Sequence, residues 1–106
     1  MSRDLIFTVE FHVKPEHRAE FLDALLQVLN QMAKESTFVS THLQQVAGDP
    51  NRLMIYERWA EPDMASFIDN QLKAKAYRLD YEQRLGDWLA EERKFTVFEP
   101  LGEWTR

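Results

Sequence analysis

The sequence predicts an α+β fold of the ferredoxin-like type, with elements in the order β-α-β-β-α-β. Apolar and polar residues alternate, as is typical of half-buried strands, over residues 4–13 and 38–46. Residues 53–59 and 94–99 are predicted to form two further strands. Two longer stretches between these runs repeat apolar residues every three or four positions, which is typical of helices. A chain of 106 residues has the length of one domain, so residues 1–106 are predicted to form a single domain.

The first strand and the first helix have the clearest patterns. Alternation places one set of strand side chains on a predicted core face: Leu5, Phe7, Val9, Phe11 and Val13. The residues between them form the other face: Ile6, Thr8, Glu10 and His12. Pro15 then favours the start of a helix, because its fixed φ suits a first helical turn. This helix is expected to end near residues 35–36 and to present one apolar side: Phe21, Leu22, Leu25, Leu26, Leu29 and Met32.

The middle of the chain predicts an antiparallel hairpin. In its first strand, alternation places two sets of residues on opposite faces. One set is Val39, Thr41 and Leu43, and the other is Phe38, Ser40, His42 and Gln44. Residues 47–51, which precede the next strand, are rich in the turn formers Gly, Asp, Pro and Asn. This segment is too long for a two-residue hairpin turn, so a longer loop is expected.

A second helical region and a last strand complete the pattern. Pro62 is predicted to open a helix directly after the third strand. A longer helical repeat follows: Tyr77, Tyr81, Leu85, Trp88 and Leu89. Gly86 predicts a bend or break in this helix, because glycine weakens helices. Pro100 ends the last strand.

Helices on one face of a four-stranded sheet leave its other face uncovered. That face carries many apolar and aromatic side chains, and an uncovered apolar sheet of this size is typical of an interaction surface. A second copy of the same sheet is the simplest cover, so a homodimer is expected.

The composition excludes several classes of function. The net charge is −5 and the basic residues are scattered, which argues against a nucleic-acid partner, because phosphate binding needs a clustered basic face. The chain has no Cys, and its three His residues lack the spacing of metal ligands, so no metal site is expected. No apolar run approaches the roughly 20 residues that span a bilayer. The first residues also lack the layout of a signal peptide. A soluble, cytoplasmic protein with no membrane partner is therefore expected.

The third strand and the helical region after it contain the candidate site. Glu57 and Trp59 are two residues apart, so they share one face of their strand. Four polar or amphipathic residues follow on a helical segment that can face the same side: Asn70, Gln71, Tyr77 and Tyr81. For a flat aromatic ligand, Trp59 and Tyr77 are the predicted ring contacts, and Asn70 or Tyr81 is the predicted polar partner.

A proton acceptor is predicted among the histidines, since histidine titrates near neutral pH. His42 lies on the strand that is predicted to pair with the strand of Glu57, so His42 is the first candidate and Glu57 the next. Each residue also has a structural interpretation. Glu57 can be an ion-paired strand carboxylate, Trp59 a packing residue, and His42 a histidine at the rim.

The segment DPNRLMIYERWAEPDMASF, which contains the motif Tyr56-Glu57-Arg58-Trp59, is followed by NQLKAKAYRLDYEQRL and FTVFEPLGEW. Together they resemble the antibiotic biosynthesis monooxygenase family over nearly the whole chain. The resemblance implies a ferredoxin-like subunit that dimerises into an α+β barrel. It also implies oxygenation of an electron-rich aromatic such as a quinol without a flavin, haem or metal cofactor. Many members carry histidines in the helix after this motif, whereas residues 69–72 read DNQL and residues 74–77 read AKAY. A base from those histidines is therefore not carried over.

These observations predict a cofactor-independent monooxygenase that acts on a quinol-like or polycyclic phenolic molecule. The missing helix histidines favour an alternative, a non-catalytic dimeric barrel that binds a small hydrophobic metabolite, so enzymatic activity stays open. A haem-degrading relative ranks last, because it needs an axial histidine and only His12 and His42 lie on predicted strands.

Overall fold

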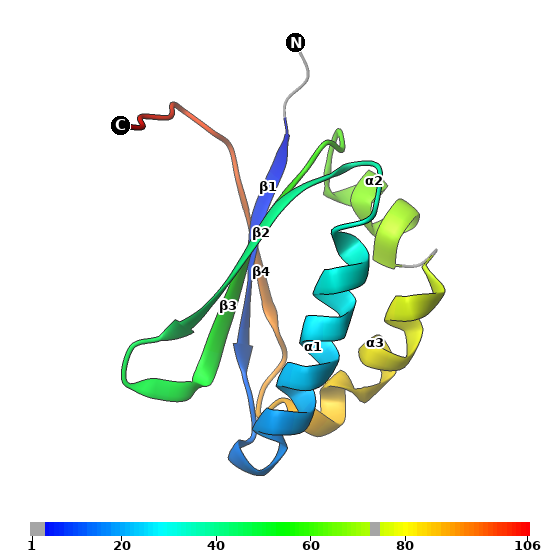
Figure 1. Cartoon of the computed structure of the whole chain (residues 1–106), viewed down its shortest axis with the longest axis vertical. Coiled ribbons are helices and arrows are strands. Elements are labelled where there is room, and N and C mark those ends of the chain that lie inside the picture. Colours follow the sequence, from blue (N-terminus) through cyan, green and yellow to red (C-terminus); the bar gives the residue numbers. More distant parts are fainter. Residues whose placement is uncertain (1–3, 73–74) are drawn as a thin grey trace.

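Helices cover one face of a four-stranded antiparallel sheet (Figure 1). The computed structural model describes residues 4–72 and 75–106. Its elements are β1 (Leu5–His12), the 3-10 turn η1 (Pro15–His17), α1 (Arg18–Met32), β2 (Phe38–Val46), β3 (Asp49–Trp59), α2 (Met64–Phe67), the π-helical turn η2 (Ile68–Leu72), α3 (Ala76–Trp88) and β4 (Lys94–Phe98). The strands lie in the order β2-β3-β1-β4, so β3 and β1 are central and β2 and β4 are edges. This arrangement confirms the predicted ferredoxin-like plan.

The core lies between the helices and the predicted inward face of β1. The alternating residues of this face are all buried: Leu5, Phe7, Val9, Phe11 and Val13. The buried side of α1 packs against them: Phe21, Leu25, Val28 and Met32. Leu26, which was expected on this side, is 45% exposed, and Val28 takes the buried place instead. The apolar side of α1 that reaches the sheet is therefore narrower than the apolar side that the sequence pattern predicted.

The hairpin between β2 and β3 turns in only two residues, Ala47 and Gly48, so the expected longer loop is wrong. Gly48 has a φ of 84°, a left-handed conformation that glycine adopts without strain. Asp49 already belongs to β3 and pairs with Val46, while the next register pair joins Gln45 to Leu53. The turn-forming residues after Asp49 are thus accommodated as an irregularity within the strand.

A second irregularity reverses the expected face of Phe38. The register shifts between Phe38 and Ser40, and Phe38 lies opposite Trp59. The two rings meet edge to face, with centroids 5.3 Å apart at an interplanar angle of 89°. Phe38 therefore packs against the core, whereas Val39 is exposed. Strict alternation failed here because the bulge adds a residue to one strand.

The segment after β3 begins its helix at Met64, two residues later than Pro62. The side chain of Asp63 caps this helix, since its Oδ1 accepts a hydrogen bond from the backbone nitrogen of Ser66 at 2.8 Å. Further along, α3 continues through Gly86 and ends at Trp88. Gly86 thus lies in the last turn of the helix.

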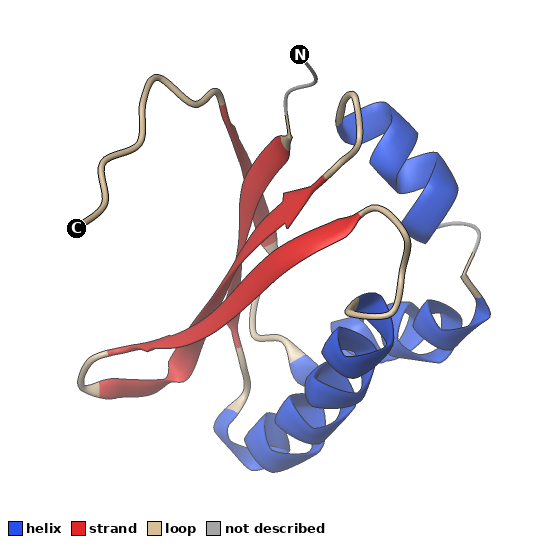
Figure 2. Cartoon of the chain, turned by 45° about the horizontal axis from the view of Figure 1, so that its top comes forward, coloured by secondary structure: helices blue, strands red, loops and turns tan. Residues whose placement is uncertain are grey.

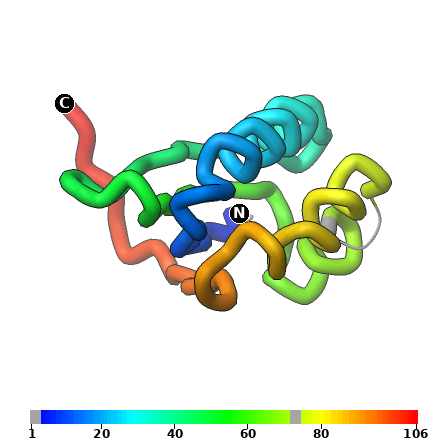
Figure 3. The backbone as a smooth tube through the Cα atoms, turned by 90° about the horizontal axis from the view of Figure 1, so that it is seen from below, coloured from blue at the N-terminus to red at the C-terminus, as the bar shows by residue number. Residues whose placement is uncertain are grey.

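The other face of the sheet carries no helix (Figure 2). Thr8 of β1 and Tyr56 of β3 are register partners near the middle of this uncovered face. After β4 the chain has no regular secondary structure and leaves the body on the side away from α2 and α3 (Figure 3). Two large apolar side chains of this tail, Leu101 and Trp104, are 98% and 88% exposed. Within the described ranges, no helix is long and apolar enough to cross a membrane.

Candidate functional site

A mostly apolar cavity lies between the inward face of the sheet and the helices α1 and α3. The cavity and its open mouth together contain about 320 Å³ that no atom occupies. The centre of a water-sized sphere can reach only about 20 Å³ of this volume. Its walls are chiefly aliphatic and aromatic: Val9, Phe11, Leu25, Met32, Ile55 and Phe67. Four polar side chains also reach it: Glu57, Arg78, Tyr81 and Arg93. In this closed shape the cavity accommodates about one water molecule.

Glu57 is a carboxyl group inside the apolar wall. It lies in the inward row of β3, and only 4% of its surface is exposed. The indole nitrogen of Trp59 donates a hydrogen bond to Glu57 Oε1 at 2.9 Å. Burial raises the pKa of Glu57 from 4.5 to about 7, against the smaller lowering effects of the Trp59 bond and of the charges on Arg78 and Arg93. Glu57 can therefore exchange a proton near neutral pH.

Trp59 positions this carboxyl group. Its side chain is fully buried, between Phe38 and the ring of Phe67, whose centroid is 5.0 Å away. These contacts fix the indole plane, so the nitrogen points at Glu57. The spacing of two residues on one strand places both groups on the same face, as predicted.

Arg78 of α3 is a buried cation, with 4% of its surface exposed. Its Cζ lies 5.6 Å from the ring centroid of Phe67 and 5.8 Å from that of Tyr77. Two of its donors, Nε and Nη2, are buried and have no hydrogen-bond partner within residues 4–72 and 75–106. A buried donor without a partner is costly, because it has lost its water and gained nothing in return. A ligand oxygen in the cavity would remove this cost.

Tyr81 and Arg93 complete the polar part of the cavity. Tyr81 is 5% exposed, and burial raises the pKa of its phenol, which stays a neutral donor. Arg93 donates from Nη1 to Glu82 Oε2 at 2.9 Å, and its Nη2 donates to the other carboxylate oxygen. The guanidinium also lies 5.0 Å above the ring of Phe95, which is 38% exposed on the edge strand β4. Arg93 and Phe95 thus form the mouth of the cavity toward solvent.

Tyr77 and Asn70, the predicted contacts from the helical region, have other partners. Tyr77 is half-buried beside Arg78, and its hydroxyl donates to Glu35 Oε2 at 3.4 Å. Asn70 is exposed, and its side-chain nitrogen donates to Glu61 Oε1 at 3.3 Å. Among the six site residues predicted from sequence, the structure brings Glu57, Trp59 and Tyr81 together.

His42 lies on the opposite face of the sheet, which corrects its expected place beside the pocket. It pairs in register with Tyr56, whereas Glu57 pairs with Thr41. The His42 side chain is exposed, and its ring centroid is 6.1 Å from that of Tyr56. Successive strand residues point to opposite faces, so the sheet itself separates His42 from Glu57.

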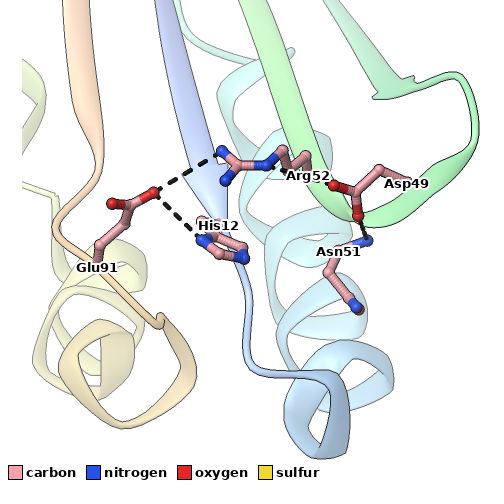
Figure 4. A network of polar contacts seen from close by, with 5 residues as sticks. All are labelled: His12, Asp49, Asn51, Arg52 and Glu91. Atoms are coloured by element: carbon pink, nitrogen blue, oxygen red, sulfur yellow. Dashed lines mark hydrogen bonds and ion pairs between the residues drawn. The ribbon is translucent and has the colours of Figure 1, made fainter.

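His12, the other strand histidine, belongs to a polar network at the end of β1 (Figure 4). Its Nδ1 lies 3.2 Å from Glu91 Oε1, and Arg52 Nη1 lies 3.8 Å from the same oxygen. Arg52 Nε also contacts Asp49 Oδ2 at 3.3 Å. The network joins the segment after α3 to the two central strands, so it has a structural role at the base of the sheet.

Neither Arg78 nor Arg93 was predicted from the sequence as a site residue. One signal was present: Arg78 and Tyr81 are three residues apart, so they share a helix face with the core residue Leu85. A charged residue on the apolar face of an amphipathic helix is unusual and marks a buried charge. Arg93 gave no such signal, because its place at the mouth depends on the turn between α3 and β4.

Comparisons with known proteins agree with this architecture. A family model described as antibiotic biosynthesis monooxygenase matches residues 5–77. A structure from Nitrosomonas europaea is 24% identical, with a TM-score of 0.80 over 95% of this chain and 93% of that one. Rv0793 from Mycobacterium tuberculosis is 19% identical, with a TM-score of 0.81 over 97% and 100% of the two chains. SnoaB from Streptomyces nogalater, described as a cofactor-independent oxygenase, is 17% identical, with a TM-score of 0.77 over 97% and 98%. No curated protein matches the sequence. At these identities the structures establish a common fold.

Proposed function

We propose that this chain, which belongs to the antibiotic biosynthesis monooxygenase family, is a cofactor-independent monooxygenase that acts on a quinol-like or polycyclic phenol. One observation carries the proposal. A buried carboxyl group with a pKa of about 7 shares an apolar cavity with a buried guanidinium, two of whose nitrogens have no hydrogen-bond partner among the described residues. A base and an oxyanion partner in a dry site suit the activation of a phenol.

The chemistry needs only the substrate and O₂. Loss of a proton turns the quinol into an electron-rich anion that can give one electron to O₂. The two radicals then combine to form a carbon–oxygen bond, and the resulting hydroperoxide loses water. Overall, a quinol and O₂ give a hydroxyquinone and water, so one oxygen atom enters the product and the other leaves as water.

Each polar residue of the cavity has a role in this scheme. Glu57 accepts the phenolic proton, which requires its ionised form. Trp59 holds the carboxylate through the 2.9 Å hydrogen bond. Arg78 and Tyr81 supply donors for the negative charge that develops on the substrate oxygen. The apolar walls exclude water, which strengthens each of these interactions.

Substrate entry requires the mouth of the cavity to widen. The closed cavity holds about one water molecule, whereas an aromatic ring needs more room. Phe95 lies on an edge strand and is partly exposed, so its ring can move outward without breaking the buried core. Arg93 borders the same opening.

The protein is also proposed to act as a homodimer, with the uncovered sheet faces of two copies in contact. Apolar and aromatic side chains such as Tyr56 and Phe98 lie on this face, and the exposed tail residues Leu101 and Trp104 extend beside it. The cavities lie on the other side of each sheet, so each subunit keeps its own site.

Oxygen consumption tests the function directly. A panel of naphthohydroquinones and anthrones is added to metal-free protein in an oxygen electrode, with Glu57→Gln as the active-site variant and Glu16→Gln, an exposed carboxylate, as its matched control. Uptake above the rate of autoxidation that is lost in Glu57→Gln and kept in Glu16→Gln is the expected result. Binding of these molecules without any oxygen uptake would instead support a non-catalytic barrel that holds a hydrophobic metabolite.

A further inference from the structure

We infer that Nε and Nη2 of Arg78 bind two neighbouring oxygens of one planar ligand. The preferred ligand is an aromatic 1,2-diol rather than a 1,4-diol. The inference deepens the proposed function, because it narrows the class of quinol that the cavity accepts. It starts from the identity of the two free donors, Nε and Nη2.

These two nitrogens belong to the same side of the planar guanidinium group. Their N–H bonds run nearly parallel, which is the geometry that binds two adjacent oxygens at once. A single phenolic oxygen would satisfy only one of them. The oxygens of a 1,4-diol lie at opposite ends of the ring, so one such molecule cannot reach both donors with its two hydroxyls.

The guanidinium is held in place before any ligand arrives. Phe67 lies against it and is itself packed on Phe7, at 5.1 Å between ring centroids, and on Trp59, at 5.0 Å. Tyr77 also lies beside the guanidinium and is anchored through its hydroxyl to Glu35, which pairs with Lys75 at 3.2 Å. A rigid pair of donors loses little freedom when a ligand binds, which favours selectivity for a matching pair of acceptors.

The transfer of a proton to Glu57 favours a diol over a carboxylate. No carboxylate among the described residues forms an ion pair with Arg78, although Glu57 lines the same cavity. A 1,2-diol enters neutral and still carries a proton that Glu57 can accept while both oxygens stay on Arg78. An aromatic carboxylate enters already ionised, has no such proton, and meets the charge of Glu57.

Binding under nitrogen separates this inference from the question of turnover. Isothermal titration calorimetry is run with three probes of equal ring size: 1,2-dihydroxynaphthalene, 1,4-dihydroxynaphthalene and 1-naphthoate. The expected result is that the 1,2-diol binds at least about tenfold more tightly than the other two, because it alone satisfies both charged donors and supplies a proton. Similar affinities for the two diols, or tighter binding of 1-naphthoate, would overturn the inference.

Variants then assign the preference to the guanidinium. Arg78→Lys keeps the positive charge but lacks the two parallel N–H donors of the guanidinium. This variant should reduce the preference for the 1,2-diol to about twofold or less. Arg84→Gln, on the exposed side of the same helix, is the control and should leave the preference unchanged. A full preference in Arg78→Lys would show that another group reads the two oxygens. If the protein prefers the 1,2-diol under nitrogen but shows no oxygen uptake with it, the inferred binding site is supported and the proposed oxygenase activity is refuted.

Discussion

The indole of Trp59 donates a hydrogen bond to the carboxylate of Glu57 at 2.9 Å, and both side chains are buried on the inward face of β3. The bond stabilises the ionised form of Glu57, whereas burial favours the protonated form. Burial is the larger effect, so the carboxyl group titrates near neutral pH. The balance between the two effects can be changed with single substitutions.

Trp59→Phe should raise the pKa of Glu57 above its wild-type value of about 7, because the variant keeps a buried ring and loses the donor. The measurement is a pH titration of the glutamate side chains by ¹³C NMR. Trp88→Phe is the matched control, since Trp88 is equally buried but donates to Glu20. A downward shift or no shift in Trp59→Phe would contradict the assigned role of the indole.

Glu57→Gln should remove a pH-dependent part of the stability. The folded protein keeps the Glu57 proton between pH 4.5 and about 7, where the unfolded chain has lost it. The resulting stabilisation is full below pH 4.5 and is lost as the pH rises through about 7. The shift corresponds to about 3 kcal/mol. The free energy of unfolding of wild type minus that of Glu57→Gln should therefore fall by this order between pH 4 and pH 8 in urea titrations. A flat difference would mean that Glu57 titrates normally.

His42→Ala should leave quinol oxidation nearly unchanged, because His42 lies on the face of the sheet away from the cavity. Glu57→Gln should reduce turnover by a factor of roughly 10² to 10⁴, the usual effect of a lost general base. Turnover in wild type should rise with pH through about 7, as Glu57 ionises. The opposite result, a large loss in His42→Ala alone, would return the proton acceptor to the histidine first chosen from sequence.

Tyr56→Glu should dissociate the proposed dimer, since it places a charge near the middle of the uncovered sheet face. Multi-angle light scattering at micromolar concentration should give a dimer for wild type and a monomer for this variant. Leu79→Glu is the control, because Leu79 is 50% exposed on α3, on the helical side of the molecule. A monomeric wild-type protein would refute the dimer itself.

The fold was predictable because its signals are local. The alternation of β1 and the helical repeats of α1 and α3 each report burial within one segment. Phe38 was misplaced because a bulge changes the face of a residue without changing the apolar pattern. The two-residue turn at Ala47 and Gly48 was missed because Asp49 and the proline after it are compatible with both a loop and an irregular strand.

The site was predictable only where it depended on neighbours in sequence. Glu57 and Trp59 are two apart on one strand, so their common face followed from strand geometry. The position of His42 depended on the register between β2 and β3, because a shift of one residue moves each side chain of a strand to the other face of the sheet. Arg78 and Arg93 meet Glu57 only through the packing of α3 and β4 on the sheet, which no local pattern encodes.

The division of the cavity between central and edge elements has a consequence for how the protein can diversify. Glu57 and Trp59 lie on β3, a central strand with partners on both sides, and such strands tolerate little change. Phe95 lies on the edge strand β4, where a side chain has fewer neighbours to disturb. Substitutions at the mouth can therefore alter which molecules enter while the proton-transfer pair stays intact. Related chains can acquire new substrates through substitutions on this edge strand, with little loss of folding stability.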